Sequence, residues 1–183
     1  MKTFPLILLL GLAVLGVFVE ATFELPRRWL GSQIDILTPL MVCCAIMTGV
    51  WEVALFAVVG GLLLDSLSAN PLGLSVLPLF WTGLVLERLK DLLLRDLAYA
   101  QAVLGGLAAG VVMLLKLGLL LTLGETPLVG WSTGWHLVVN CAGGVVLTPL
   151  LFRMVTVLCG LLAYQPSTTM SFRSDREIKR GRT

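Results

Sequence analysis

Long runs of apolar residues dominate the chain and limit what it can fold into. Hydrophobic residues make up 57% of the 183 positions and charged residues only 13%, against about 25% charged in an ordinary soluble domain. Lipid is therefore the expected solvent. A segment inside hydrocarbon must satisfy its own backbone hydrogen bonds, which leaves α-helices or closed β-barrels. The runs lack the apolar–polar alternation of barrel strands, so the sequence predicts an all-α, polytopic membrane protein.

The apolar runs predict six transmembrane helices. The expected spans are residues 4–19, 36–50, 53–65, 73–86, 98–123 and 135–162, with a tight connection at 49–52. The third is short against the roughly 20 residues of a perpendicular crossing. Residues 19–21 also fit a signal-peptide cleavage site, although a retained first span is favoured. The spans form one domain, residues 1–163, and a basic cytoplasmic tail, residues 164–183, is expected to be disordered.

Lysine and arginine residues predict the orientation. With the N-terminus in the cytoplasm, Lys2, the loop after the fourth span and the tail place nine Lys and Arg inside. The outer loops hold only Arg27 and Arg28, in agreement with the positive-inside rule. Tryptophans are then expected at the outer interface (Trp29, Trp131, Trp135) and at the inner one (Trp51). The sequence predicts a multi-pass membrane protein with both termini in the cytoplasm.

The residues between the third and fourth spans form a corner. A Gly-Leu-rich helix ends at Asp65, and Pro71-Leu72-Gly73 starts the next apolar run. Proline suits the first turn of a helix, where its missing N–H costs nothing. Asn70, just ahead of it, can cap free N–H groups. These residues predict a hairpin between two spans, with a carboxylate at its edge.

This corner resembles the rod shape-determining protein MreD family, small integral membrane proteins of the bacterial cell-wall elongation machinery. The matching positions are Gly61, Asp65, Pro71, Leu72 and Gly73. The resemblance implies a fold similar to the substrate-binding (S) subunits of ECF vitamin transporters. It also implies a non-enzymatic scaffold in the bacterial inner membrane that supports cell shape and peptidoglycan synthesis. The implied partners are MreC, the MreB filament, RodA and a class B transpeptidase.

Two other functions stay open from the sequence. One is the substrate-binding subunit of an ECF-type small-molecule transporter. Such subunits dock their energising partner through small residues spaced by four on the first helix, whereas here that helix holds Gly11, Ala13 and Gly16. The outer loops also offer few polar groups for a vitamin. The other is a structural membrane protein of an unknown pathway.

Two charged residues lie in or at the ends of the expected spans. Asp65 is either a polar anchor or partner contact, the default for an intramembrane carboxylate, or a helix-end residue bonded to the N–H groups of residues 66–68. Lys116 either extends toward the outer interface near Glu125 or forms an ion pair with Asp65. The sequence leaves both choices open.

Small residues recur at every fourth position of the fifth span, at Ala98, Ala102, Gly106 and Gly110. A stripe of this kind lets two helix backbones approach closely. The paired glycines at 60–61 and 143–144 are candidate counterparts. The stripe therefore predicts either helix packing within the monomer or docking of another protein's membrane helix.

The sequence predicts no enzyme, cofactor or metal site. His136 has no companion base, and the residues around Ser75 lack the second glycine of a nucleophile elbow. The four cysteines lie in apolar runs without metal-ligand spacing, as buried free thiols do: Cys43, Cys44, Cys141 and Cys159. The basic tail fits binding to anionic lipid headgroups or simple fixing of the topology. Nucleic-acid binding is not expected, because Phe172 is the only aromatic residue in the segment 165–183.

Overall fold

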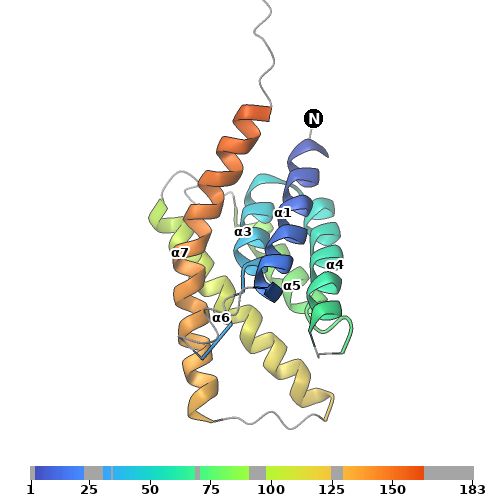
Figure 1. Ribbon diagram of the computed structural model, residues 1–183, viewed down its shortest axis with the longest axis vertical. Helices are drawn as coiled ribbons and strands as arrows, with labels where there is room; N and C mark the ends of the chain where they lie inside the picture. The colour runs from blue at the N-terminus through green and yellow to red at the C-terminus, as the bar shows by residue number, and fades with distance from the viewer. Residues whose placement is uncertain are drawn as a thin grey trace, which may run out of the picture.

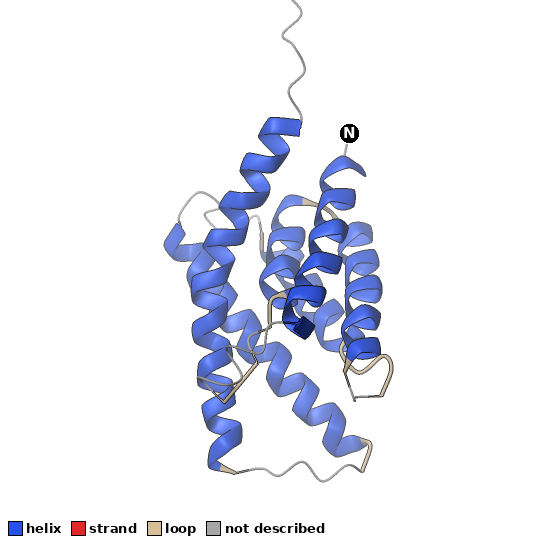
Figure 2. Ribbon diagram, in the orientation of Figure 1, coloured by secondary structure: helices blue, strands red, loops and turns tan. Residues whose placement is uncertain are grey.

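The computed structural model describes residues 3–22, 31–33, 35–68, 71–90, 98–124 and 130–162. These residues form six helices and no strand: α1 (Thr3–Thr22), α3 (Leu37–Met47), α4 (Val50–Leu67), α5 (Val76–Leu89), α6 (Ala98–Thr122) and α7 (Trp131–Leu162). The helices pack side by side in one bundle (Figure 2). The predicted all-α class is confirmed for this part of the chain, and the basic tail lies outside it.

Three of the described helices are long and apolar enough to cross a membrane: Val50–Leu67, Tyr99–Thr122 and Trp131–Leu161. In α1, the apolar segment Leu6–Thr22 is shorter than these three helices. α3 and α5 have only 11 and 14 residues, short of the roughly 20 of a full crossing. The bundle is thus compatible with a membrane protein, and the prediction of six spans stays a prediction.

α3 lies at the centre of the bundle. It contacts α1, α4, α5, α6 and α7, and it lies among these helices in Figure 1. Ten of its 11 residues are buried. A helix that is apolar around its whole circumference is stable only when other helices pack against all of its faces. Cys43 and Cys44 are free thiols inside this core, as their apolar surroundings predict.

The connection between α3 and α4 is only two residues long, Thr48 and Gly49. The Gly49 N–H donates a hydrogen bond to Oε2 of Glu52 at 3.1 Å. A carboxylate in the first turn also interacts favourably with the helix dipole. α4 therefore begins at Val50 and reaches 18 residues. The expected start of this span at residue 53 was wrong, because Glu52 belongs to the helix and caps it.

α5 begins later than the sequence suggested. Gly73 has φ of +93°, a backbone conformation that suits glycine because it lacks a Cβ. The Leu74 N–H donates to the carbonyl of Pro71 at 3.3 Å and closes a turn. Pro71 therefore lies in a turn ahead of the helix, and its expected place in the first helical turn was wrong. Asn70, the expected cap, lies outside the described residues.

α6 and α7 form the most extensive helix pair. A Cβ added to Gly105 would collide with the Thr148 side chain and the carbonyl oxygen of Gly144. A Cβ on Gly106 would lie 2.7 Å from Val145. Small residues allow such close approach of two backbones.

The two glycines chosen from the stripe, Gly106 and Gly110, both face α7. A Cβ on Gly110 would lie 3.1 Å from Sγ of Cys141. These positions therefore pack against a helix of the same chain, one of the two alternatives that the stripe allowed.

Replacement of Gly105 by alanine is expected to destabilise the protein by about 1–3 kcal/mol, the usual cost of overpacking. The added methyl group has no room, since α7 occupies its place. Thermal unfolding of the purified protein in detergent, followed by circular dichroism, measures the change. Gly118→Ala is the matched control in the same helix, because a Cβ there meets nothing within 4 Å. Equal melting of both variants would contradict this packing.

Candidate functional site

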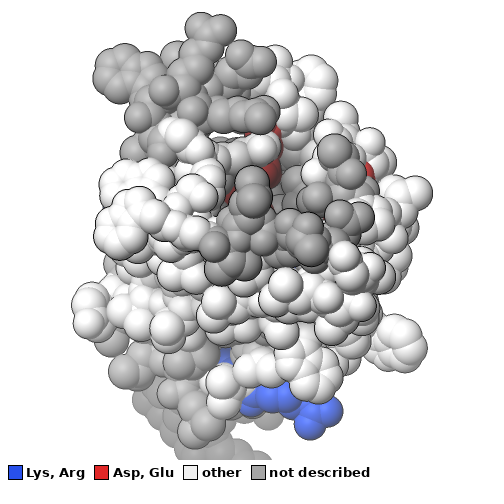
Figure 3. All heavy atoms as spheres, turned by 90° about the horizontal axis from the view of Figure 1, so that it is seen from below, with Lys and Arg blue, Asp and Glu red and all other residues white. Residues whose placement is uncertain are grey.

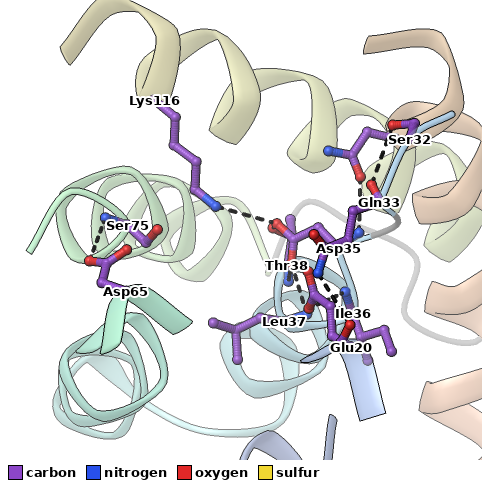
Figure 4. Close-up of polar contacts among 11 residues, drawn as sticks. Glu20, Ser32, Gln33, Asp35, Ile36, Leu37, Thr38, Asp65, Ser75 and Lys116 are labelled. Atoms are coloured by element: carbon purple, nitrogen blue, oxygen red, sulfur yellow. Dashed lines mark hydrogen bonds and ion pairs between the residues drawn. The ribbon is translucent and has the colours of Figure 1, made fainter. Parts of the chain in front are cut away.

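Asp65 is buried near the end of α4. Its Oδ2 accepts hydrogen bonds from the backbone N–H groups of Gly73 at 2.9 Å and Ser75 at 3.0 Å. N–H groups at the start of a helix have no partner within that helix, so the carboxylate supplies one. Figure 4 shows Asp65 beside Ser75. Among the described residues, the carboxylate bonds across the hairpin to α5 and not to residues 66–68.

Gly61 allows α5 to come this close. A Cβ at this position would lie 2.8 Å from the Cα of Val76, the first residue of α5. Gly61 and Asp65 are four residues apart, so they share one face of α4. This spacing places both the missing side chain of Gly61 and the acceptor oxygen of Asp65 against the start of α5.

Asp65→Ala is expected to lower the free energy of unfolding by at least about 2 kcal/mol. It leaves the buried N–H of Ser75 and the partly buried N–H of Gly73 unpaired, and each unpaired buried group costs about 1–3 kcal/mol. Asp65→Asn keeps an acceptor oxygen and should lose less. Denaturation in mixed micelles gives the values. Ser66→Ala, a change at the neighbouring exposed residue, is the control and should have little effect. The corner does not depend on Asp65 if the alanine variants at 65 and 66 are equally stable.

Asp35 lies just before α3 and bonds the start of that helix. Its Oδ1 accepts from the N–H groups of Leu37 at 2.9 Å and Thr38 at 3.1 Å, and its Oδ2 accepts from the Thr38 hydroxyl at 2.6 Å. The Asp35 N–H donates to Oδ1 of Asn140, on α7, at 3.1 Å. An acidic residue is favoured at a helix N-terminus. Asp35 therefore fixes the central helix and joins it to α7.

Lys116 reaches from α6 to Asp35. Its Nζ lies 3.7 Å from Oδ2 of Asp35, and both side chains are mostly buried. Figure 4 shows Asp35 on one side of the Lys116 ammonium and Asp65 with Ser75 on the other. A pair between Lys116 and Asp65 was one of the two alternatives left open, and it is not formed: Lys116 pairs with Asp35 instead. Glu125, the other expected neighbour, lies outside the described residues.

Glu20, in the last turn of α1, points to the same place (Figure 4). Its Oε2 accepts from the Ile36 N–H at 3.5 Å, a long distance for a hydrogen bond. Gln33 Nε2 donates to the backbone carbonyl of Glu20 at 3.2 Å. The sequence placed Glu20 and Asp35 in the first loop and did not predict that they line one pocket with Lys116. An Asp just before an apolar run is a helix-start signal that could have drawn attention to Asp35.

These side chains line a pocket of about 240 Å³. Its polar lining is Glu20, Gln33, Asp35, Ser68, Ser75, Lys116 and Asn140. A second hollow of about 670 Å³ shares Gln33 and Asn140 with the pocket and includes His136. Figure 3 shows Asp and Glu atoms at the bottom of a hollow in the face seen from below. Helix ends from across the bundle thus converge on one polar site.

The pocket offers hydrogen bonding and charge. Within the described ranges, no group of three or more His, Cys, Asp or Glu side chains could hold a metal ion. The Ser75 hydroxyl is buried without a hydrogen-bond partner there, so no base contacts it. Gly106 and Gly110 face α7 and do not line this pocket.

The opposite end of the bundle has its own polar tie. Lys90, just after α5, donates from Nζ to the carbonyl of Thr48 at 3.0 Å and pairs with Glu87 at 2.9 Å. The Thr48 carbonyl follows the last turn of α3, where carbonyls have no partner within the helix. Lys90 therefore joins the end of α5 to the link between α3 and α4. From the sequence, Lys90 was only one of the positive charges that predict the orientation, and this hydrogen bond was not predicted.

Comparisons with protein-family models, curated proteins and solved structures find no match to this chain. The fold and the site define the protein only as an α-helical bundle with three membrane-length apolar helices and a polar pocket. Any particular function is therefore a proposal.

Lys116→Met and Asp35→Asn are expected to be non-additive by about 0.5–3 kcal/mol in unfolding free energy, as residues in contact are. Asparagine keeps an acceptor for the start of α3 and removes the charge. The matched cycle pairs Lys116→Met with Asp65→Asn, which should add within about 0.5 kcal/mol. Chemical unfolding of the single and double variants measures both cycles. Coupling to Asp65 and not to Asp35 would contradict the ion pair.

Proposed function

We propose that the protein is a non-enzymatic scaffold of the bacterial cell-wall elongation complex, similar to the MreD family, and acts in regulation of cell shape. The observation that carries the proposal is the corner between α4 and α5. Three positions of the sequence resemblance, Gly61, Asp65 and Gly73, act together there. Gly61 gives α5 room, and Asp65 bonds the N–H of Gly73.

The proposal places the bundle in the inner membrane as six spans. Large apolar side chains face outward, including Leu107 at 63% and Val146 at 67% exposure, as lipid contact requires. Trp51 and Trp131 are 86% and 93% exposed, and they lie in the first turns of α4 and α7. Those helices begin at opposite ends of the bundle (Figure 1). Such tryptophans suit the two membrane interfaces.

The proposed orientation has both termini in the cytoplasm, from the distribution of Lys and Arg in the sequence. Lys90 then lies on the cytoplasmic side, and the pocket around Lys116 opens to the outer side. Short helices such as α3 do not need full membrane length on this view, because other helices cover them.

The scaffold would work through contacts between helices and loops that favour assembly of its partners. By resemblance these partners are MreC, the MreB filament, and RodA with its class B transpeptidase, together with membrane lipid. α6 offers little to a partner at Gly105, Gly106 and Gly110, because α7 already covers these three positions. Docking would therefore use other surfaces of the bundle.

A substrate-binding subunit of an ECF-type transporter is the second candidate, and the polar pocket favours it. The first helix argues against it. Ala13 is completely buried and Gly16 packs against Ile36, so neither is free to meet an energising subunit. Gly11 alone among these three small residues has open space beside it.

Depletion of the protein in a rod-shaped host is expected to give rounded cells. Expression of the unchanged protein or of Ser66→Ala should restore rods, whereas Asp65→Ala should not, because the corner is lost. Cell shape by phase-contrast microscopy and membrane levels by immunoblot are the measurements. Normal rods after clean deletion, with no paralogue present, would count against the scaffold.

Purification in mild detergent separates the candidate functions. MreC and RodA should co-purify with the scaffold, and an ATPase module should co-purify with a transporter subunit. Recovery of neither set would leave a structural membrane protein of another pathway, contrary to both proposals. Mass spectrometry identifies the bound proteins.

A further inference from the structure

α7 is longer than one membrane crossing needs. Its 32 residues extend over about 48 Å, whereas the hydrocarbon core of a bilayer is about 30 Å thick. A usual tilt of about 20° reduces this length only slightly. Trp131, in the first turn, is 93% exposed and suits the outer interface. The other end of α7 extends past α3 and α4 (Figure 1). On the proposed arrangement, α7 therefore reaches the inner interface and continues beyond it.

Arg153 is an unpaired cation in this second half of α7. It is exposed and makes no ion pair or hydrogen bond within the described part of the chain. Leu150, Val157 and Leu161 share its face of the helix, because residues three or four apart lie above one another. They are 62%, 59% and 70% exposed. We call these four residues the α7 stripe, an apolar surface that contains one positive charge.

Lipid alone fits the α7 stripe poorly. Arg153 lies about 33 Å from Trp131 along the helix, so a phosphate at the inner interface can pair with it. Leu161, about 12 Å further on, then lies outside the hydrocarbon with its apolar surface exposed. If the hydrocarbon instead reaches Leu161, the guanidinium lies inside it on an outward face, where a charge is costly. The Cα–Cβ bond of Arg153 tilts toward the start of α7 and thus away from the inner interface, which hinders extension of the side chain to water.

A helix with an acidic residue satisfies both parts of the stripe. A carboxylate pairs with a guanidinium through two parallel hydrogen bonds, and apolar neighbours on the same helix cover the remaining side chains. A second copy of this chain is a poor source of that carboxylate. Each acidic residue that the structure describes is buried or already bonded within the chain: Glu20, Asp35, Glu52, Asp65 and Glu87.

We propose that the α7 stripe is a docking surface for an apolar helix of a partner membrane protein, and that this helix carries an acidic residue that pairs with Arg153. The proposal deepens the scaffold role and rests on it for the membrane arrangement and the existence of a partner. The stripe is free for this use, because α7 meets α6 through other residues, Cys141, Gly144, Val145 and Thr148.

The test uses the full-length protein in vesicles of phosphatidylcholine, a lipid without net charge. The probe is a synthetic membrane-spanning peptide of leucine and alanine with one glutamate near the end of its apolar segment. A matched peptide carries glutamine at that position. Energy transfer between a dye on the protein's C-terminus and a dye on the peptide measures association. The glutamate peptide is expected to bind at least about fivefold more tightly, since charged residues in contact are coupled.

Arg153→Leu is expected to bind the two peptides equally. Arg153→Glu should reverse the preference, so that it favours a peptide with lysine in place of the glutamate. Both variants should fold, because the side chain is exposed and unpaired. Arg88→Leu is the matched control and should keep the preference for glutamate, since it removes another exposed arginine, in the last turn of α5.

Three results would overturn the proposal. The first is equal binding of the glutamate and glutamine peptides to the unchanged protein. The second is a lipid site, in which Arg153→Leu reduces retention of phosphatidylglycerol in native mass spectrometry and leaves peptide binding unchanged. The third is energy transfer between two labelled copies of this chain that depends on Arg153, which makes a second copy the occupant. Rounded cells after depletion, together with any of these results, would support the scaffold role without this surface.

Discussion

The rest of the structure depends on covering one short helix. α3 is apolar around its whole circumference and buries ten of its 11 residues. A helix of this kind is stable only when other helices enclose it, and five of them do so here. Because α3 is the shortest of the described helices, the longer helices around it extend beyond its ends and leave room for polar groups. Enclosure of α3 therefore sets both the bundle and the position of its pocket.

Polar groups hold the ends of the helices, and they differ between the two ends of the bundle. At the pocket end, Asp35 and Asp65 bond the starts of α3 and α5. At the other end, Glu52 caps α4, and Lys90 bonds the carbonyl that follows α3. Acidic groups at helix starts and a cation at a helix end also match the helix dipole. Apolar side chains cannot form these hydrogen bonds, so the fold needs a few buried charged residues at the helix ends.

The helical class and the approximate position of each helix could be predicted from the sequence, because apolar runs report burial directly. The pairing of Lys116 could not. Depth along a bundle follows from sequence position, but residues at one depth can lie on opposite sides of it, as Asp35 and Asp65 do around Lys116. The start of α4 was missed for a different reason. Glu52 was taken for a residue of the connection, whereas its hydrogen bond to Gly49 places it inside the helix.

The pocket is open because its charged groups already serve the fold. The oxygens of Asp35 accept hydrogen bonds at the start of α3, and Lys116 pairs with Asp35. Neither side chain can move toward Glu20 without breaking one of these contacts. Asp65 is held in the same way by the turn before α5. A cavity lined by fixed groups keeps its shape, and fixed polar groups bind a ligand at little cost in ordering. The hydrogen bonds of Asp65 that hold the corner between α4 and α5 therefore also preserve the shape of the pocket beside it.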